Sequence, residues 1–190
     1  MLRQCCELDL PLRKQAARLV KEASQLQYMD LKAELVTDAL AKEFLEDYCE
    51  LSNAYARLSA DKGVVGVVAW YPSSDFGSYK KASLHHMLSH LSSDDASQYL
   101  ARLKLLRAEI PPLPPSQYLA LLAVRCDMRG TGVADQLLWD FPSKPASRDY
   151  SLHVASDNSR AINFYRKHEF SFLEPTDKLF KVMLRKGYTN

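Results

Sequence analysis

The sequence contains no apolar run of about 18 residues, the length that a membrane-spanning helix needs, so we expect no membrane association. It also lacks an excess of charge of one sign. The 25 basic and 23 acidic side chains leave a formal charge of +2, too little for a protein whose main partner is a polyanion such as nucleic acid. The four cysteines show no Cys-x-x-Cys spacing, which favours reduced intracellular thiols.

The first twelve residues do not form a signal peptide, because Arg3, Glu7 and Asp9 lie among their apolar residues. The hydrophobic fraction of 47% and the charged fraction of 25% are those of a globular chain and exclude a disordered one. A length of 190 residues suits one domain, at about 150 residues per domain. We therefore expect a soluble, cytoplasmic protein with a single domain over residues 1–190.

Hydrophobic periodicity predicts helices followed by a hairpin in the first half of the chain. The expected elements are a short strand over Gln4–Leu10 that stops at Pro11, helices over Leu12–Leu26 and Leu31–Phe44, and strands over Ala54–Ala60 and Val64–Tyr71. Two further helical faces lie between residues 79 and 110, with an N-cap at Ser92–Asp95. The proline-rich run Pro111–Pro115 cannot be helical, so it predicts an extended connector.

The second half alternates between strands and helices. Tyr118–Val124 is apolar at nearly every position, which predicts a central strand covered on both faces. It is followed by a short helix over Gly130–Trp139 ended near Pro142, a strand over Tyr150–Ala155, a helix over Ser159–Lys167 and a strand over Leu179–Leu184. This alternation after a hairpin predicts an α/β fold, a mixed sheet with helices on both faces and a helical insertion, residues 79–110, before the central strand.

The run Arg129-Gly130-Thr131-Gly132-Val133-Ala134 follows the buried strand and opens a helix, an arrangement suited to binding a phosphate. A dinucleotide fingerprint needs a third glycine where Asp135 stands, and the Gly-Lys-Ser/Thr ending of a P-loop is absent. By itself the run is equally well explained as a plain strand-to-helix turn.

The residues around this turn resemble the acetyl-CoA signature of the GNAT superfamily of N-acetyltransferases, with its Arg/Gln-x-x-Gly-x-Gly/Ala core at Arg129–Ala134. A second block of that family, Leu-x-Val and then Asn-x-x-Ala-x-x-Phe-Tyr with a following aromatic, is matched in the expected order. Its positions are Leu152, His153, Val154, Asn158, Ala161, Phe164, Tyr165 and Phe170. The resemblance covers about Tyr118 to Phe172, and the second block is similar to that of the Met-starting type of protein N-terminal acetyltransferase.

The resemblance implies a mostly antiparallel GNAT-like sheet, acetyl-CoA as co-substrate, no metal, and direct acetyl transfer to a primary amine. It implies Tyr165 as the proton donor to the leaving thiolate, and His153 with Tyr118 as the general base acting through a held water. The implied cofactor-binding residues are Leu122, Ala123, Val124, Arg129, Gly130, Thr131, Gly132, Val133, Ala134, Asp135 and Asn158. We expect the acceptor to be a small amine or a peptide N-terminus, and the protein to be a monomer or homodimer, with the 79–110 helices forming part of the acceptor cleft.

Two residues depart from the family pattern. Glu169 stands where a glycine usually ends the helix of the second block, so we expect a different geometry there. Cys126 stands where many relatives have proline, and we expect a buried, inert thiol.

Alternative interpretations remain at this stage. The domain could bind acyl-CoA without catalysis, or be a nucleotide-dependent enzyme of another fold, although the missing third glycine argues against the latter. His86 and His90 have the spacing of two metal ligands but are interpreted as exposed helix residues, because no third ligand follows. Trp70-Tyr71 is interpreted as core or cleft wall, and Lys80-Lys81 as a solvated helix start.

Overall fold

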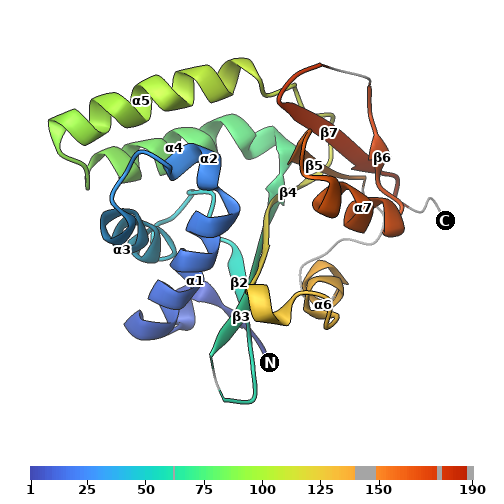
Figure 1. The fold of residues 1–190 in the computed structure, drawn as a ribbon, viewed down its shortest axis with the longest axis horizontal. Coiled ribbons are helices and arrows are strands. Elements are labelled where there is room, and N and C mark those ends of the chain that lie inside the picture. Colours follow the sequence, from blue (N-terminus) through green and yellow to red (C-terminus); the bar gives the residue numbers. More distant parts are fainter. Residues whose placement is uncertain (62, 140–148, 175–176, 188–190) are drawn as a thin grey trace.

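The computed structural model describes residues 1–61, 63–139, 149–174 and 177–187, which form one seven-stranded sheet with helices on both faces (Figure 1). The strand order is β1-β2-β3-β4-β5-β7-β6, and the neighbouring strands in these residues are antiparallel except for the parallel pair β4 and β5. The strands are β1 (Leu2–Gln4), β2 (Ala54–Leu58), β3 (Val64–Pro72), β4 (Gln117–Val124), β5 (Tyr150–Ala155), β6 (Ser171–Phe172) and β7 (Phe180–Arg185). The predicted fold class, a mixed and mostly antiparallel sheet between helices, is confirmed.

The helices divide between the two faces of the sheet. One face is covered by α1 (Leu10–Ala23) and α3 (Ala33–Glu43), which are joined by the short helix α2 (Gln25–Tyr28), and the other by α6 (Val133–Trp139) and α7 (Ser159–Lys167). The helices between β3 and β4, α4 (Phe76–Leu88) and α5 (Ser93–Ala108), lie across one end of the sheet, with α4 against α3 and α5 against α2 (Figure 1). Short 3-10 turns lie at Cys5–Glu7, Ser73–Asp75 and Cys126–Met128.

The side chains of β3 divide between two separate cores, with the alternation shifted once by the irregularity opposite Arg57 and Leu58. Val64, Val67 and Ala69 belong to the core beneath α1 and α3, and Val65, Val68 and Trp70 to the core beneath α6 and α7. A register shift between Ala69 and Trp70 interrupts the ladder with β4. Because both faces of β3 are buried, its sequence is continuously apolar, as expected for a strand with helices on each side.

Several element boundaries differ from the sequence predictions. The first strand is Leu2–Gln4 rather than Gln4–Leu10, because Asp9 caps a helix that begins at Leu10 and accommodates Pro11 in its first turn, where no N–H is needed. The helix predicted from Gly130 begins at Val133, and its predicted end near Pro142 lies outside the described residues. The two insertion helices occupy 76–108 rather than 79–110, and β6 was not predicted because it has only two residues.

The end of α7 corrects a further expectation. Glu169 has φ +66°, the left-handed conformation that glycine usually supplies, so the helix ends as a glycine-capped helix would. The Phe170 N–H donates to the Tyr165 carbonyl at 3.0 Å, and the Glu169 N–H to the Arg166 carbonyl at 3.1 Å. The Glu169 carboxylate also accepts from the Arg185 guanidinium at 3.1 Å. This ion pair and the packing of the Phe170 ring on Tyr165 offset the strain of a left-handed non-glycine residue.

Candidate active site

The strands β4 and β5 separate within the sheet. Their pairing ends at Leu119 and Leu152, although β4 continues to Val124 and β5 to Ala155. The Arg125 N–H donates to the Val65 carbonyl at 2.9 Å, on the β3 side. By alternation, the main-chain groups of Leu122 and Val124 point the other way, into the opening between β4 and β5. Both side chains are half-buried, so the prediction that β4 is covered on both faces holds only in part.

The turn after β4 is held open by glycine. Gly130 and Gly132 have φ of +82° and +86°, and a Cβ added to either would meet no atom within 4 Å. Among the described residues, none of the hydrogen bonds uses the N–H of Gly132, Val133 or Ala134 as its donor. Consecutive free amides beside open space can accept an anion.

Neighbouring side chains fix the shape of this turn. The Thr131 hydroxyl donates to the Met128 carbonyl at 2.6 Å, and Arg129 Nε donates to the Val124 carbonyl at 3.2 Å. On β3, a Cβ on Gly66 would lie 2.5 Å from the Leu137 side chain and 3.0 Å from the Ala123 carbonyl oxygen. The absence of a side chain at Gly66 therefore lets α6 pack tightly on the sheet, which sets the position of the turn.

Besides Arg129 and Thr131, three more of the predicted cofactor-binding residues are engaged within the protein. The Ala123 side chain is buried and its main-chain groups face β3. The side chain of Asn158 caps α7 by accepting from the Ala161 N–H at 3.1 Å. The Asp135 carboxylate is 3.0 Å from His168 Nε2 and 3.3 Å from Lys167 Nζ.

Asp135 belongs to a network that joins α6 to α7. The Trp139 indole N–H donates to His168 Nδ1 at 2.9 Å, so His168 Nε2 carries the proton that it donates to Asp135. Burial raises the pKa of Asp135, but the hydrogen bond and charge of Lys167, together with the contact with His168, outweigh this, and the pKa lies below its usual value. The network fixes α6 against α7 on one side of the opening.

The three predicted catalytic residues lie near one another. The Tyr118 hydroxyl is 3.2 Å from His153 Nδ1, and His153 Nε2 is 2.8 Å from the Pro111 carbonyl oxygen. A carbonyl can only accept, so Nε2 carries the proton and Nδ1 presents its lone pair to the Tyr118 hydroxyl. Burial, and to a smaller extent the charge of Lys80, lower the pKa of His153 to about 4, so its ring is neutral at pH 7.

Tyr165 lies on α7, within electrostatic range of Tyr118. Burial raises the pKa of Tyr165 well above the usual value, so its phenol remains protonated at neutral pH. The pKa of Tyr118 is also raised, first by burial, then by the charge of Glu50, and then by a charge on Tyr165. The two phenols are therefore electrostatic neighbours, and β4, β5 and α7 each contribute one titratable side chain to this site.

Sequence reasoning missed the next layer of the site. The Phe76 ring packs 5.2 Å from Tyr118 and 5.7 Å from His153, and Lys80 Nζ lies 5.7 Å from the Phe76 ring. Lys80 also pairs with Glu50 at 2.8 Å, with its side chain 37% exposed, so the interpretation as a solvated helix start holds for the exposed Lys81 and only in part for Lys80. Glu50 carries no sequence signal, because it precedes β2 in a loop without a motif.

Glu50 links the site to a buried acid. Its carboxylate accepts from the Tyr71 hydroxyl at 2.9 Å, and its N–H donates to Ser83 Oγ at 2.8 Å. Ser83 Oγ in turn donates to Glu43 Oε1 at 2.5 Å. Glu43 is 2% exposed, and burial, reinforced by the charge of Glu50, raises its pKa to about 7.

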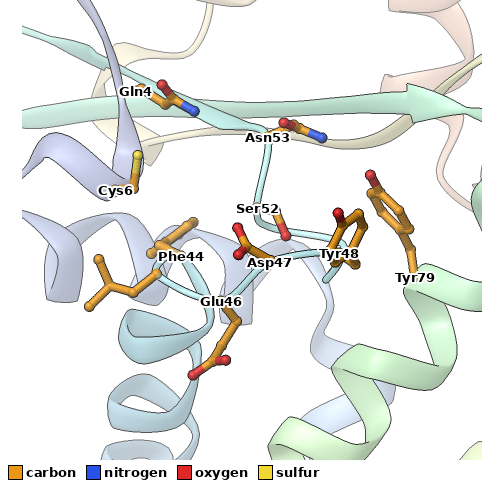
Figure 2. A pocket seen from close by; sticks show the side chains of 10 residues that line it. Gln4, Cys6, Phe44, Glu46, Asp47, Tyr48, Ser52, Asn53 and Tyr79 are labelled. Carbon is orange, nitrogen blue, oxygen red and sulfur yellow. The ribbon is translucent and has the colours of Figure 1, made fainter.

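An open cavity of about 290 Å³ lies beside the loop between α3 and β2 (Figure 2). It is lined by residues 44–48 and 52–53, with Gln4, Cys6 and Tyr79. Tyr79 is its connection to the candidate site, because its ring packs 4.8 Å from Tyr71 and Tyr71 packs 5.2 Å from Tyr118. The turn residues, Tyr165 and His153 do not line this cavity.

Two further sequence interpretations change. His86 is not an exposed helix residue, because its side chain is 8% exposed and its Nε2 bonds the Ala39 carbonyl at 2.9 Å. Cys126 is exposed rather than buried. In the described ranges, no group of three His, Cys, Asp or Glu residues is arranged to hold a metal ion, and no helix has the length and apolarity to cross a membrane.

No family model and no curated protein matches the chain. Solved structures do match it along nearly its whole length. An N-acetyltransferase from Staphylococcus aureus Mu50 has a TM-score of 0.74 at 19% identity, covering 97% of this chain and 99% of that chain. Ard1 from Thermoplasma volcanium has a TM-score of 0.54 at 17% identity, covering 100% and 98%.

A third structure contains a ligand. The PaiA N-acetyltransferase from Thermoplasma acidophilum, in complex with coenzyme A, has a TM-score of 0.51 at 13% identity and covers 98% of both chains. Identities this low establish the fold alone. The chain has the fold of the GNAT N-acetyltransferases, as its two sequence blocks predict.

Proposed function

We propose that this chain is an acetyl-CoA-dependent N-acetyltransferase that transfers the acetyl group directly to a primary amine. One observation carries the proposal: main-chain groups of β4 and a glycine turn face the opening between β4 and β5, and Tyr118, His153 and Tyr165 lie on the elements beside it. The acceptor is a small amine or a peptide N-terminus, since a net charge of +2 provides no field to recruit a charged macromolecule. Residues 1–190 act as one domain, in which α4 and α5 cover the acceptor side.

The residues present fit acetyl-CoA. The main-chain groups of Leu122 and the N–H of Val124 would hold its pantetheine amides, as a neighbouring strand would, while the Val124 carbonyl accepts from Arg129. The amides from Gly130 to Ala134 would hold its pyrophosphate, in the space that a Cβ on Gly130 or Gly132 would enter. When bound, acetyl-CoA supplies the thioester from which the acetyl group is transferred.

The acceptor must lose a proton before its nitrogen can attack. The neutral His153 holds its Nδ1 lone pair on the Tyr118 hydroxyl, so a proton taken up at the Tyr118 oxygen releases the hydroxyl proton to Nδ1. This relay works directly or through a bound water. With a pKa of about 4, His153 is a weak base. An α-amine, with a pKa of about 8, is therefore a better acceptor than a lysine amine, with a pKa of about 10.4.

Tyr165 provides the proton for the leaving group. Its raised pKa keeps the phenol protonated at neutral pH, and the departing thiolate needs one proton to become a stable thiol. The two proton transfers thus use different residues on different elements, with His153 and Tyr118 on the strands and Tyr165 on α7.

Amide hydrogen exchange tests the cofactor placement. Saturating acetyl-CoA should slow amide exchange at Leu122, Gly132, Val133 and Ala134. Exchange at Ala123 should not change, because its main chain faces β3, so this amide is an internal control. A folded Gly132→Val variant should lose this protection. Protection of none of these amides at saturating acetyl-CoA would contradict the placement.

A panel assay of CoA release tests the activity. Polyamines, aminoglycosides, amino acids and short Met- or Ser-starting peptides should include at least one acceptor. Binding of acetyl-CoA without CoA release on any amine would favour a non-catalytic acyl-CoA-binding domain. Acetylation of internal lysines on folded proteins, with no activity on small amines or peptides, would contradict the acceptor assignment.

A further inference from the structure

The connector between α5 and β4, residues 109–116, is attached to the protein at several points. The Glu109 carboxylate accepts from the Leu179 N–H at 3.0 Å, beside the start of β7. The Pro114 carbonyl accepts from the hydroxyls of Ser73 and Ser116 at 2.9 and 2.8 Å. Between these attachments, the Pro111 carbonyl accepts from His153 Nε2 at 2.8 Å. The connector therefore reaches the candidate base from outside the sheet.

The sequence of the connector restricts the direction of that carbonyl. The ring of Pro111 fixes its own φ near −65°. The following residue is Pro112, whose ring disfavours the helical region for the residue before it and holds the ψ of Pro111 near 120–160°. Both torsions that aim the Pro111 carbonyl are thus limited by covalent structure, before any tertiary contact forms.

The Pro111 carbonyl selects one tautomer of the His153 ring, whereas the Tyr118 hydroxyl does not. A tyrosine hydroxyl both donates and accepts, so Tyr118 is compatible with a proton on either nitrogen of the ring. A carbonyl only accepts, and so it requires the proton on Nε2. Phe76, whose ring packs against His153, offers no polar atom, and Lys80 and Glu50 act on the ring through their charges.

We propose that the Pro111–Pro112 step is a positioning device that holds His153 in its Nε2–H tautomer and so aims the Nδ1 lone pair at Tyr118. The tautomer assignment depends only on the contacts above, whereas its kinetic consequence rests on the proposed function. If His153 is the base, only molecules in the Nε2–H tautomer can accept the relayed proton. The turnover rate then scales with the fraction of molecules in that tautomer.

The test measures the tautomer and the turnover separately. Nitrogen-15 NMR of histidine-labelled protein at pH 7.5 should show His153 with its proton on Nε2 alone. Pro112→Ala removes the restriction on the ψ of Pro111, so we expect a mixture of the two His153 tautomers. An even mixture would lower kcat about twofold and leave the KM for acetyl-CoA unchanged. The matched control is Pro115→Ala, which frees Pro114, whose carbonyl bonds serine hydroxyls instead.

The two readouts keep the two proposals apart. Two results would overturn the positioning role regardless of activity. One is a proton on Nδ1 of His153 in the wild-type protein, and the other is the Nε2–H tautomer alone in folded Pro112→Ala. A tautomer shift in a protein that acetylates no amine would support the positioning role and count against the proposed function. Should Pro112→Ala not fold, the wild-type spectrum and a Pro112→Gly variant give the same decision.

Discussion

Glu43 is the residue at which pH should act most directly on folding. Its pKa rises from an ordinary 4.5 to about 7 in the folded protein because the carboxyl is buried. Between these values the folded protein keeps the proton and the unfolded chain has released it, so stability falls as pH rises from about 4.5 to 7 and stays low above. The effect amounts to about 3 kcal/mol.

Glu43→Gln should therefore be more stable than wild type at pH 8 and show little advantage at pH 4.5. Urea denaturation at several pH values measures this difference directly. Glu46→Gln is the control, because Glu46 is near in sequence but its side chain is 55% exposed, and it should change little at either pH. An equal effect of the two substitutions would contradict the buried, protonated Glu43.

The contribution of His153 to the free energy of unfolding should change with pH in the direction opposite to that of Glu43. The pKa of His153 falls from 6.5 to about 4, so between these values the unfolded chain holds a proton that the folded protein lacks. Its contribution is present above pH 6.5 and is lost as pH falls to about 4. His153→Phe should remove this loss, so the unfolding free energy of the variant relative to that of wild type should increase as pH falls from 7 to 4.5, whereas the Glu43 contribution is common to both proteins and cancels in this comparison.

Tyr165 can be separated from its packing role by kinetics. Tyr165→Phe keeps the ring that packs on Phe170 and removes only the proton donor. We expect kcat to fall roughly 100-fold with little change in KM. Unfolding free energies within about 0.5 kcal/mol of wild type would show that the loss is not structural. A wild-type kcat would leave Tyr165 only its contact with neighbouring rings.

At the residue scale, the sequence predicts the motif residues of the candidate site but not the side chains that contact them. The resemblance to the family predicts Tyr118, His153 and Tyr165, and in the structure Tyr118 contacts His153 while Tyr165 lies within electrostatic range of Tyr118. Glu50 and Phe76 come from a loop and from the insertion, and their contacts with the site depend on how those segments pack. Burial also depends on packing, which is why His86 and Cys126 were assigned the wrong environments.

At the scale of elements, the contact between α6 and β3 decides where the glycine turn lies. Gly66→Ala would place a Cβ 2.5 Å from the Leu137 side chain, so α6 must move away from the sheet. We expect a destabilisation of about 1–3 kcal/mol and weaker binding of acetyl-CoA. Gly77→Ala in α4 is the control, because its Cβ meets no atom within 4 Å, and it should be neutral or stabilising by up to ~1 kcal/mol.

Calorimetry for acetyl-CoA binding and denaturation for stability would measure both effects. Unchanged acetyl-CoA affinity in a destabilised Gly66→Ala variant would separate the position of α6 from cofactor binding and contradict the prediction.

Elements with a strong local signal matched their predictions, and those set by tertiary contacts did not. β5 and α7 have the predicted bounds, because an alternating strand and a capped amphipathic helix are both specified locally. The end of α7 is different: nothing local favours a left-handed Glu169, and its ion pair with Arg185 of β7 forms only in the folded sheet. Pro11 shows that a local signal can also be ambiguous. A proline can end a strand, as predicted here from the sequence, but it can equally occupy the first turn of a helix, as it does in α1.

At the scale of the whole molecule, the two parts of the sheet meet through three residue pairs of β4 and β5. A ligand that binds in the opening between these strands interacts with the folded protein alone. Acetyl-CoA at 100 times its Kd should therefore raise the unfolding free energy by ~2.7 kcal/mol. This corresponds to a Tm increase of about 5–10 °C for a chain of this size. Thermal denaturation measures the shift, which Gly132→Val should abolish.

The order of strands and helices followed from the sequence because the two family blocks fix the centre of the sheet. The position of the insertion did not, since the sequences of α4 and α5 do not specify which part of the sheet these helices cover. Their place at the end of the sheet brings Phe76 and Lys80 to the site, and under the proposed function that placement would shape the acceptor side.

The strands at the two edges of the sheet are the shortest in it. β1 has three residues and β6 has two, so the unpaired backbone at either edge is too short to template a long ladder with another chain. Edge-to-edge aggregation, the usual hazard of an open sheet, is thereby disfavoured. Any self-association of this protein must therefore use helical or loop surfaces rather than a continuous intermolecular sheet.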